Sequence, residues 1–292
     1  MVGSRTLKAL LEGTRPRQWS KNVLVAAAPL SAGVLVESTV WVRVLAAFAS
    51  FVAASAAVYL LNDVCDREHD RRHPLKRDRP VASGRLPVGV AVVAAGVAAL
   101  LSLGIGLAVA PDLAVVMAVY LVSQVAYSYW LKQQPVLDIA VVSLAFLLRA
   151  VAGGVAAQVE LSQWFLLVAS FGSLLVVAGK RFSELVRLGA DAGTRASLTM
   201  YSESYLRFVW SLAAAVTVTA YSLWAFEIAP PTGVPWQAVS IAPFTIAILR
   251  YAADVDRGVA GEPEEVVLRD HVLQVIGIVW LACFVLGVAA RG

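Results

Sequence analysis

LLNDVCDREHDRRHPLKRDRPVASG, residues 60–84, lies between two long apolar segments and decides how the rest of the chain is interpreted. Three of its aspartates, Asp63, Asp66 and Asp70, are spaced three and four residues apart. If the preceding helix continues, this spacing puts the three carboxylates on one helical face. Like charges on one face repel each other unless a cation lies among them. The pattern therefore predicts a cation site, to which Asn62 would add a fourth oxygen ligand.

The ligand types at this site favour Mg²⁺ over Zn²⁺. Carboxylate and amide oxygens suit a hard cation, and the sequence has no Cys/His cluster at metal-ligand spacing here. Mg²⁺ usually takes few protein ligands and completes its shell with water and substrate phosphate. Basic residues that would attract such a phosphate follow at Arg71, Arg72, Lys76, Arg77, Arg79 and Arg85. We therefore expect a Mg²⁺–phosphate site in which Asp63, Asp66 and Asp70 are the catalytic residues.

The composition indicates a membrane protein. Of the 292 residues, 59% are hydrophobic and 15% are charged, whereas a soluble protein of this length is closer to half apolar. The net charge of +4 reflects topology and phosphate affinity, and no basic soluble domain supports nucleic-acid binding. Cys65 and Cys283 lie in different settings, so a disulfide is not expected. The polar N-terminal segment does not look like a cleaved signal.

The apolar segments predict an all-α, polytopic fold of about nine transmembrane helices, with residues 1–292 as one domain. About 20 apolar residues span a bilayer. The segments near this length are residues 20–37, 41–61, 88–110, 112–131, 136–157, 161–180, 204–227, 236–253 and 270–290. The first of them is short and contains Pro29. The polar connections near 62–87, 180–203 and 254–270 are the expected catalytic loops.

The Lys and Arg residues gather in alternate connections. They occur in the N-terminal segment and after the second, fourth, sixth and eighth apolar segments, but not in the turns at 37–40, 110–112, 157–162 and 228–236. By the positive-inside rule, the N-terminus and the catalytic loops are then cytoplasmic and the C-terminus is outside. We expect a multi-pass protein of the cell (inner) membrane, with its site at the cytoplasmic face.

Further candidate residues lie at the ends and in the middle of the apolar segments. Tyr127 and Lys132 end the fourth segment, a pattern equally typical of an interfacial aromatic belt with a snorkelling lysine. Asp138 starts the next helix and is also a candidate cap. Arg149 lies midway along that helix, where a charge costs about 2.5–3.5 kcal/mol. We expect Arg149 to face a phosphate, a polar cavity or a partner acid.

Two later stretches also carry charge. Lys180 and Arg181 follow the sixth segment with Glu184 nearby, which suits either an anionic substrate group or a positive-inside anchor. The loop 254–270 holds Glu262, Glu264 and Glu265. A solvated loop explains it better than a lid or a second metal site.

The pattern N-D-x-x-D-x-x-x-D at residues 62–70, at the end of a second helix, resembles the UbiA superfamily of intramembrane prenyltransferases. The resemblance implies that these residues hold Mg²⁺ against a diphosphate, and that Tyr127 and Lys132 contact phosphate. Typical members carry a second aspartate-rich motif after helix six. This chain has GKRFSEL at residues 179–185 instead, with Asp191 further on, which argues against a prenyl diphosphate donor.

Four motifs together, RPRQWSKN (15–22), NDVCDREHD (62–70), YSYWLKQQPVLD (127–138) and GKRFSEL (179–185), resemble the decaprenyl-phosphate phosphoribosyltransferase branch of actinobacterial cell-wall (arabinan) synthesis. This branch implies Mg²⁺-dependent transfer of 5-phosphoribose from phosphoribosyl diphosphate (PRPP) to a polyprenyl phosphate, with release of pyrophosphate. The residues then expected to bind substrate are Lys21, Asn62, Arg72, Lys76, Arg77, Tyr127, Lys132, Arg149, Lys180, Arg181 and Glu184.

Other functions remain as alternatives. The nearest is a UbiA-type prenyltransferase that moves a prenyl chain from prenyl diphosphate to an aromatic acceptor. A transporter would need polar residues through the membrane and on both faces, whereas the ionisable residues here cluster on one face. His69, His73 and His271 have no partners at metal spacing, and we assign none of them as a general base. The sequence leaves the oligomeric state open.

Overall fold

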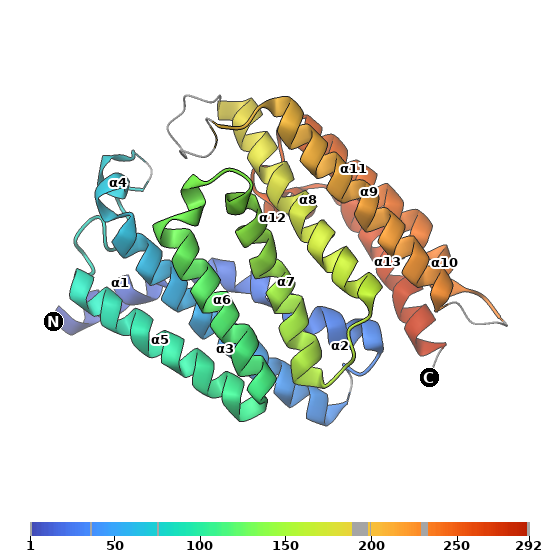
Figure 1. Cartoon of the computed structure of the whole chain (residues 1–292), viewed down its shortest axis with the longest axis horizontal. Helices are drawn as coiled ribbons and strands as arrows, with labels where there is room; N and C mark the ends of the chain where they lie inside the picture. Colours follow the sequence, from blue (N-terminus) through green and yellow to red (C-terminus); the bar gives the residue numbers. More distant parts are fainter. Residues whose placement is uncertain are drawn as a thin grey trace. The chain divides into compact units, whose positions relative to one another are not determined.

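The computed structural model describes residues 2–35, 37–74, 76–188, 198, 200–228 and 233–290. Over these residues the chain consists of helices and their connections, so the all-α prediction is confirmed. The long helices are α3 (Ser38–Cys65), α5 (Val88–Val109), α6 (Pro111–Tyr129), α7 (Leu137–Ala157), α8 (Gln163–Leu188), α9 (Glu203–Glu227), α11 (Ile241–Asp256) and α13 (His271–Ala289) (Figure 1). Between and before them lie α1 (Val2–Gly13), α2 (Ala27–Ala32), α4 (Arg67–Arg72), α10 (Trp236–Val239), α12 (Pro263–Arg269) and two 3₁₀ helices, η1 (Pro16–Ala26) and η2 (Leu131–Gln133).

Eight helical segments among the described residues are long and apolar enough to cross a membrane, with α10 and α11 together forming one of them. All eight coincide with predicted spans. The remaining predicted span, 20–37, consists of η1 followed by the six-residue α2. Pro29 in α2 has no N–H to donate to the Val25 carbonyl, so one helical hydrogen bond is missing where η1 meets α2.

Contacts between the helices divide the chain into two compact units. The first comprises residues 1–30, 34–132 and 148–160. Its centre is α3, which packs against α5 and α6 (Figure 1). Small residues allow close approach there: a Cβ on Gly106 would lie 3.2 Å from the Ala114 Cα, and Ser50 Oγ donates to the Ser102 carbonyl at 2.8 Å. Such small and hydroxyl-bearing contacts are what hold helices together in lipid.

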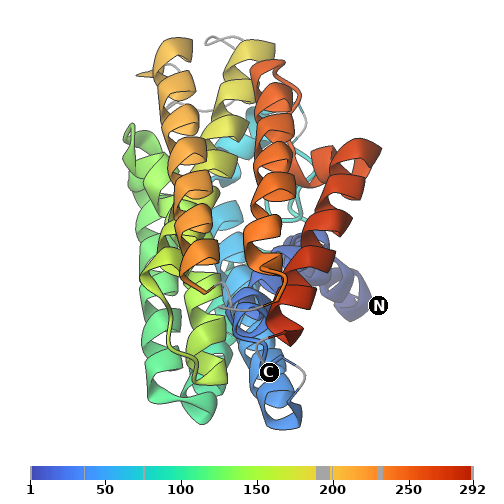
Figure 2. The ribbon, with the colours of Figure 1, turned by 90° about the vertical axis from the view of Figure 1, so that its right-hand side faces the viewer.

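The second unit comprises residues 31–33, 133–147 and 161–292. In it α8 packs against α9, and α11 packs against α8, α9 and α13; Figure 2 shows α9, α11 and α13 side by side in orange to red. Its core is apolar and includes Leu175, Phe182, Leu206 and Val255. Helix α7 contributes to both units, with residues 137–147 in the second and 148–157 in the first.

Candidate active site

Helix α3 ends at Cys65, and the backbone leaves helical geometry at Asp66, although the Asp66 N–H still donates to the Asn62 carbonyl. Asp66 has φ −90° and ψ 2°, and α4 begins at the next residue. The spacing predicted that the three aspartates share one face of a continuous helix. Because the helix breaks at Asp66, they do not. The break matters because α4 brings Asp70 to the same arginine that Asp63 contacts.

Protein cations lie among the carboxylates. Arg79 Nη1 is 2.7 Å from Asp70 Oδ2 and 3.4 Å from Asp63 Oδ1, so one guanidinium bridges the two aspartates. Arg15 also forms an ion pair with Asp63, and Lys132 forms one with Asp66. Asp63 and Asp70 are almost fully buried. The mutual repulsion expected from the sequence is thus relieved by arginine and lysine side chains.

The backbone at Arg15 is unusual for a non-glycine residue. Its φ of 52° lies in the left-handed region, where an L-residue is disfavoured. The side chain reaches the Asp63 carboxylate and its guanidinium lies 4.9 Å from the Tyr59 ring centroid. These two contacts compensate for the backbone strain and fix the N-terminal segment to the end of α3.

The other predicted site residues of the first unit differ in how deeply their side chains are buried. Asn62 Nδ2 donates to Asp66 Oδ2 at 3.1 Å, so the motif holds itself together. Tyr127 lies half-buried on the last turn of α6, and Lys21 lies half-buried on η1. Of the predicted substrate-binding residues after Asp70, Arg72 and Arg77 are exposed and Lys76 is half-buried.

Arg149 is buried in a cage of neutral groups. Its Nε donates to Asn22 Oδ1 at 2.8 Å, and its Nη2 donates to Tyr120 Oη at 3.2 Å and to Ser55 Oγ at 3.3 Å. The guanidinium also lies 5.1 Å from the Tyr120 ring centroid and 5.4 Å from that of Phe51. This polar cage meets the expectation that a charge in mid-span avoids lipid.

The η1 segment approaches α7 closely at the same level. A Cβ on Gly153, one turn after Arg149, would lie 1.7 Å from the Val25 carbonyl oxygen. Only glycine permits this distance. Arg149 and Gly153 together therefore dock the segment that carries Lys21.

In the second unit, Arg181 belongs to a buried network. Its Nε lies 3.3 Å from Asp138 Oδ2, and its Nη1 lies 3.3 Å from Glu184 Oε2. Asp138 also accepts a 2.6 Å hydrogen bond from the Tyr201 hydroxyl. Burial and this bond to Asp138 raise the pKa of Tyr201. Lys180, 4.0 Å from Glu184, keeps more of its side chain exposed than Arg181 does.

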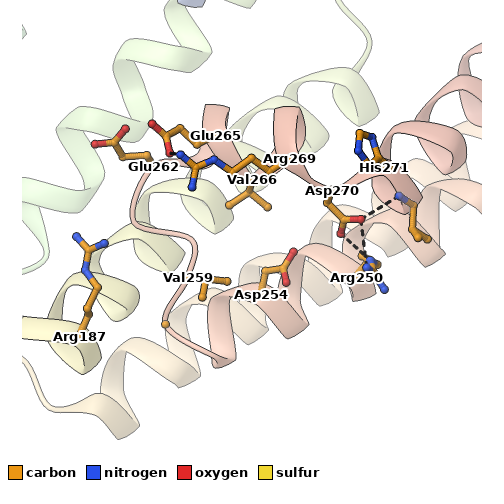
Figure 3. A pocket seen from close by; sticks show the side chains of 12 residues that line it. Arg187, Arg250, Asp254, Val259, Glu262, Glu265, Val266, Arg269, Asp270 and His271 are labelled. Carbon is orange, nitrogen blue, oxygen red and sulfur yellow. Dashed lines mark hydrogen bonds and ion pairs between the residues drawn. The ribbon is translucent and has the colours of Figure 1, made fainter.

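The loop 254–270 lines a cavity of about 730 Å³ in the second unit (Figure 3). Several of its charges are paired: Arg250 Nε is 2.6 Å from Asp270 Oδ2, and Arg269 Nη2 is 2.8 Å from Glu265 Oε2. Asp270 also caps α13 through the backbone N–H groups of Val272 and Leu273. The bond to Arg250, above all, lowers the pKa of Asp270. Asp191 and the side chain of Glu264 lie outside the described residues.

Sequence reasoning missed several of these partners. Neither Arg15 nor Arg79 was expected at the carboxylates, although both belong to the basic runs that were noticed. Tyr201 was not considered as a partner of Asp138, because 63 residues separate them. Asn22 and Tyr120 carried no spacing signal that could have connected them with Arg149.

The UbiA prenyltransferase family model matches residues 23–269. The chain belongs to this family. Decaprenyl-phosphate phosphoribosyltransferase of Mycobacterium tuberculosis (strain H37Rv) is 52% identical over 278 residues, which cover 94% of this chain and 92% of that protein. The protein of the same name from Corynebacterium glutamicum is 50% identical over 96% of this chain and 86% of its own length. The resemblance to this branch of the UbiA family is thereby confirmed.

Solved structures agree on the fold. A UbiA homolog from Archaeoglobus fulgidus bound to DMAPP and Mg²⁺ superimposes with a TM-score of 0.72 at 18% identity, covering 96% of this chain and 98% of that one. At this identity the likeness establishes the UbiA fold alone.

Proposed function

We propose that this chain transfers 5-phosphoribose from PRPP to a polyprenyl phosphate, decaprenyl phosphate or a close analogue, and releases pyrophosphate. The observation that carries the proposal is about half identity, over nearly the whole chain, to proteins named for this activity. The site agrees chemically. Carboxylates suited to a hard cation and cationic groups suited to phosphate lie against each other at the end of α3.

The residues that would hold Mg²⁺ are Asn62, Asp63, Asp66 and Asp70. Asp70 Oδ1 is a buried carboxylate oxygen without a hydrogen-bond partner, which is an acceptor position that a cation would satisfy. In the described part of the chain, no three Asp, Glu, His or Cys side chains converge on one point. At this site, Arg79 and Lys132 lie against the aspartates. Bound Mg²⁺ would supply charge neutralisation on the leaving diphosphate.

The cations beside the carboxylates are then the first contacts of the donor phosphates. Guanidinium and ammonium groups bind phosphate oxygens at least as readily as carboxylates. We propose that Arg15, Arg79 and Lys132 turn from Asp63, Asp66 and Asp70 to the diphosphate when substrate enters. Lys21, Arg72, Lys76, Arg77 and Tyr127 are the further proposed contacts.

The buried arginines have a different proposed role. Arg149 and Arg181 are enclosed by protein groups, so we propose that they position neighbouring residues. Arg181 would hold Glu184 in place, and Glu184 would in turn orient Lys180. Lys180 is the better candidate for the ribose 5-phosphate, because its side chain is more exposed.

The reaction requires no general base. The C1–O bond of PRPP breaks, pyrophosphate leaves with the electron pair, and an oxygen of the lipid phosphate bonds to C1. A phosphate monoester has a second pKa of about 6 and is already anionic near neutral pH. Catalysis then rests on positioning and on electrostatic stabilisation. We propose a single displacement with inversion at C1.

We propose that the candidate site lies at the cytoplasmic face of the cell membrane, which the distribution of Lys and Arg supports. We also propose that the chain acts as a single functional domain, whose catalytic loops are residues 62–87, 180–203 and 254–270.

The test offers two donors to the purified protein in nanodiscs. With ¹⁴C-PRPP and decaprenyl phosphate, we expect a labelled lipid and an equal amount of pyrophosphate, both abolished by EDTA and restored by Mg²⁺. With labelled prenyl diphosphate and an aromatic acceptor, we expect no product. Prenyl transfer, or full transfer of phosphoribose in EDTA, would overturn the proposal.

A further inference from the structure

Helix α1 presents three kinds of side chain on three sectors of its surface. Ala9 and Gly13 are buried against the protein. Leu7 and Leu11, one turn apart, are 58% and 53% exposed. The charged residues Arg5, Lys8 and Glu12 occupy a third, exposed sector. A helix that only covered the protein core would need no apolar side chains outside its buried sector.

The place where α1 docks fixes its depth. Ala9 packs in a cluster with Leu60 of α3 and Leu86, just before α5. A Cβ on Gly13 would lie 2.9 Å from Leu60 Cδ2, so the contact is tight. Leu60 lies near the end of one membrane span, and α5 begins another. Helix α1 therefore packs near the end of one candidate membrane span and the start of another; Figure 1 shows where α1, α3 and α5 lie in the fold.

The length of α1 excludes a crossing. Its 12 residues extend about 18 Å, well short of the roughly 30 Å hydrocarbon core. An ion pair between Glu12 and Arg85, 2.6 Å from Oε2 to Nη1, ties its end to the loop before α5. Helix α1 is thus held against the end of α3 and the loop before α5, while Leu7 and Leu11 stay exposed.

We propose that α1 lies in the plane of the membrane and binds anionic lipid. Leu7 and Leu11 enter the boundary between headgroups and acyl chains, and Arg5 and Lys8 contact the headgroup phosphates. Apolar residues beside basic residues at interfacial depth are the properties of such helices. A second copy of the chain fits less well, because the leucines lie beside Arg5 and Lys8, and the carboxylate of this sector, Glu12, is already paired with Arg85.

The test measures depth in the full-length protein. Leu7→Cys, Leu11→Cys and, as an aqueous control, Glu68→Cys are made in a Cys65→Ser/Cys283→Ser background and labelled with bimane. Glu68 lies on α4 with a 68% exposed side chain. The proteins are reconstituted in nanodiscs of phosphatidylglycerol or phosphatidylcholine. Quenching by a shallow spin-labelled lipid is compared with quenching by iodide.

We expect the lipid quencher to reach positions 7 and 11 and iodide to reach position 68. Lipid quenching at positions 7 and 11 should be stronger in phosphatidylglycerol than in phosphatidylcholine. The double substitution Arg5→Gln/Lys8→Gln should abolish this difference. Iodide quenching at 7 and 11 as strong as at 68 would overturn the proposal. So would protection from both quenchers that rises with protein density, because this would indicate a second copy of the chain.

Discussion

The carboxylates at the end of α3 and the carboxylate at the start of α7 are both paired with cations, but they differ in what the partner can do. Asp66 and its partner Lys132 are each about one-quarter exposed. Asp138 and its partner Arg181 are almost completely buried. A phosphate can compete for Lys132 without opening the protein core, whereas loss of Arg181 from Asp138 would leave a fully buried carboxylate without this cation.

We expect this difference to distinguish residues that act in turnover from residues that stabilise the fold. In the sequence, Asp66 with Lys132 and Asp138 with Arg181 look the same, because all four are charged residues near helix ends. The accessible pairs have groups to exchange with a ligand, and Asp70 keeps one oxygen without a partner. The sealed pair links α7 and α8 and, through Tyr201, the segment before α9. Substitutions should therefore affect turnover in the first region and unfolding in the second.

The largest effect is expected from Asp66→Asn. It removes the charge that opposes Lys132 and one of the proposed Mg²⁺ ligands, so phosphoribosyl transfer should fall by about 100-fold or more. The melting temperature in detergent should change little, because Asp66 is partly solvated. Initial rates at saturating PRPP and thermal unfolding measure the two quantities.

Glu68→Gln is the matched control. Glu68 is an exposed carboxylate two residues away, paired with Arg71 at 3.1 Å. Removing it should leave turnover unchanged. Equal losses in both variants would mean that general surface charge, and not the motif, is responsible.

A smaller but structural effect is expected from Asp138→Ala. The variant takes from the buried Arg181 its fully buried carboxylate partner and leaves the less buried Glu184, which should lower the free energy of unfolding by about 3–5 kcal/mol. The double variant Asp138→Leu/Arg181→Met removes both charges and should regain most of this stability. Denaturant titration of the three proteins in the same detergent measures the difference. A double variant as unstable as Asp138→Ala would show that the pair itself stabilises the fold.

The sequence predicted eight of the spans correctly because each is a long apolar run whose length matches the bilayer. At 20–37, an apolar run that contains Pro29, the structure has η1 followed by α2 in place of one continuous α-helix. The sequence identified the aspartates by type and spacing. It could not find that Arg79 bridges Asp63 and Asp70, because the break at Asp66 is a backbone feature without a sequence signature. Long-range partners such as Tyr201 and Asp138 depend on packing, which spacing along the chain does not encode.

The smallest effect is expected at a third pair, Glu12 with Arg85, which is exposed on both sides and tied to neither site. The hydrogen bond from Arg85 lowers the pKa of Glu12 below that of an ordinary glutamate. A carboxyl whose folded pKa is lowered stabilises the fold above its unfolded pKa, and this contribution disappears as the pH falls through the folded value. Glu12→Gln should therefore cost less than about 1 kcal/mol near pH 7. The melting temperatures of variant and wild type, compared from pH 7 downward, should converge below pH 4.5. A difference that persists in acid would mean that Glu12 acts through packing of α1 rather than through charge.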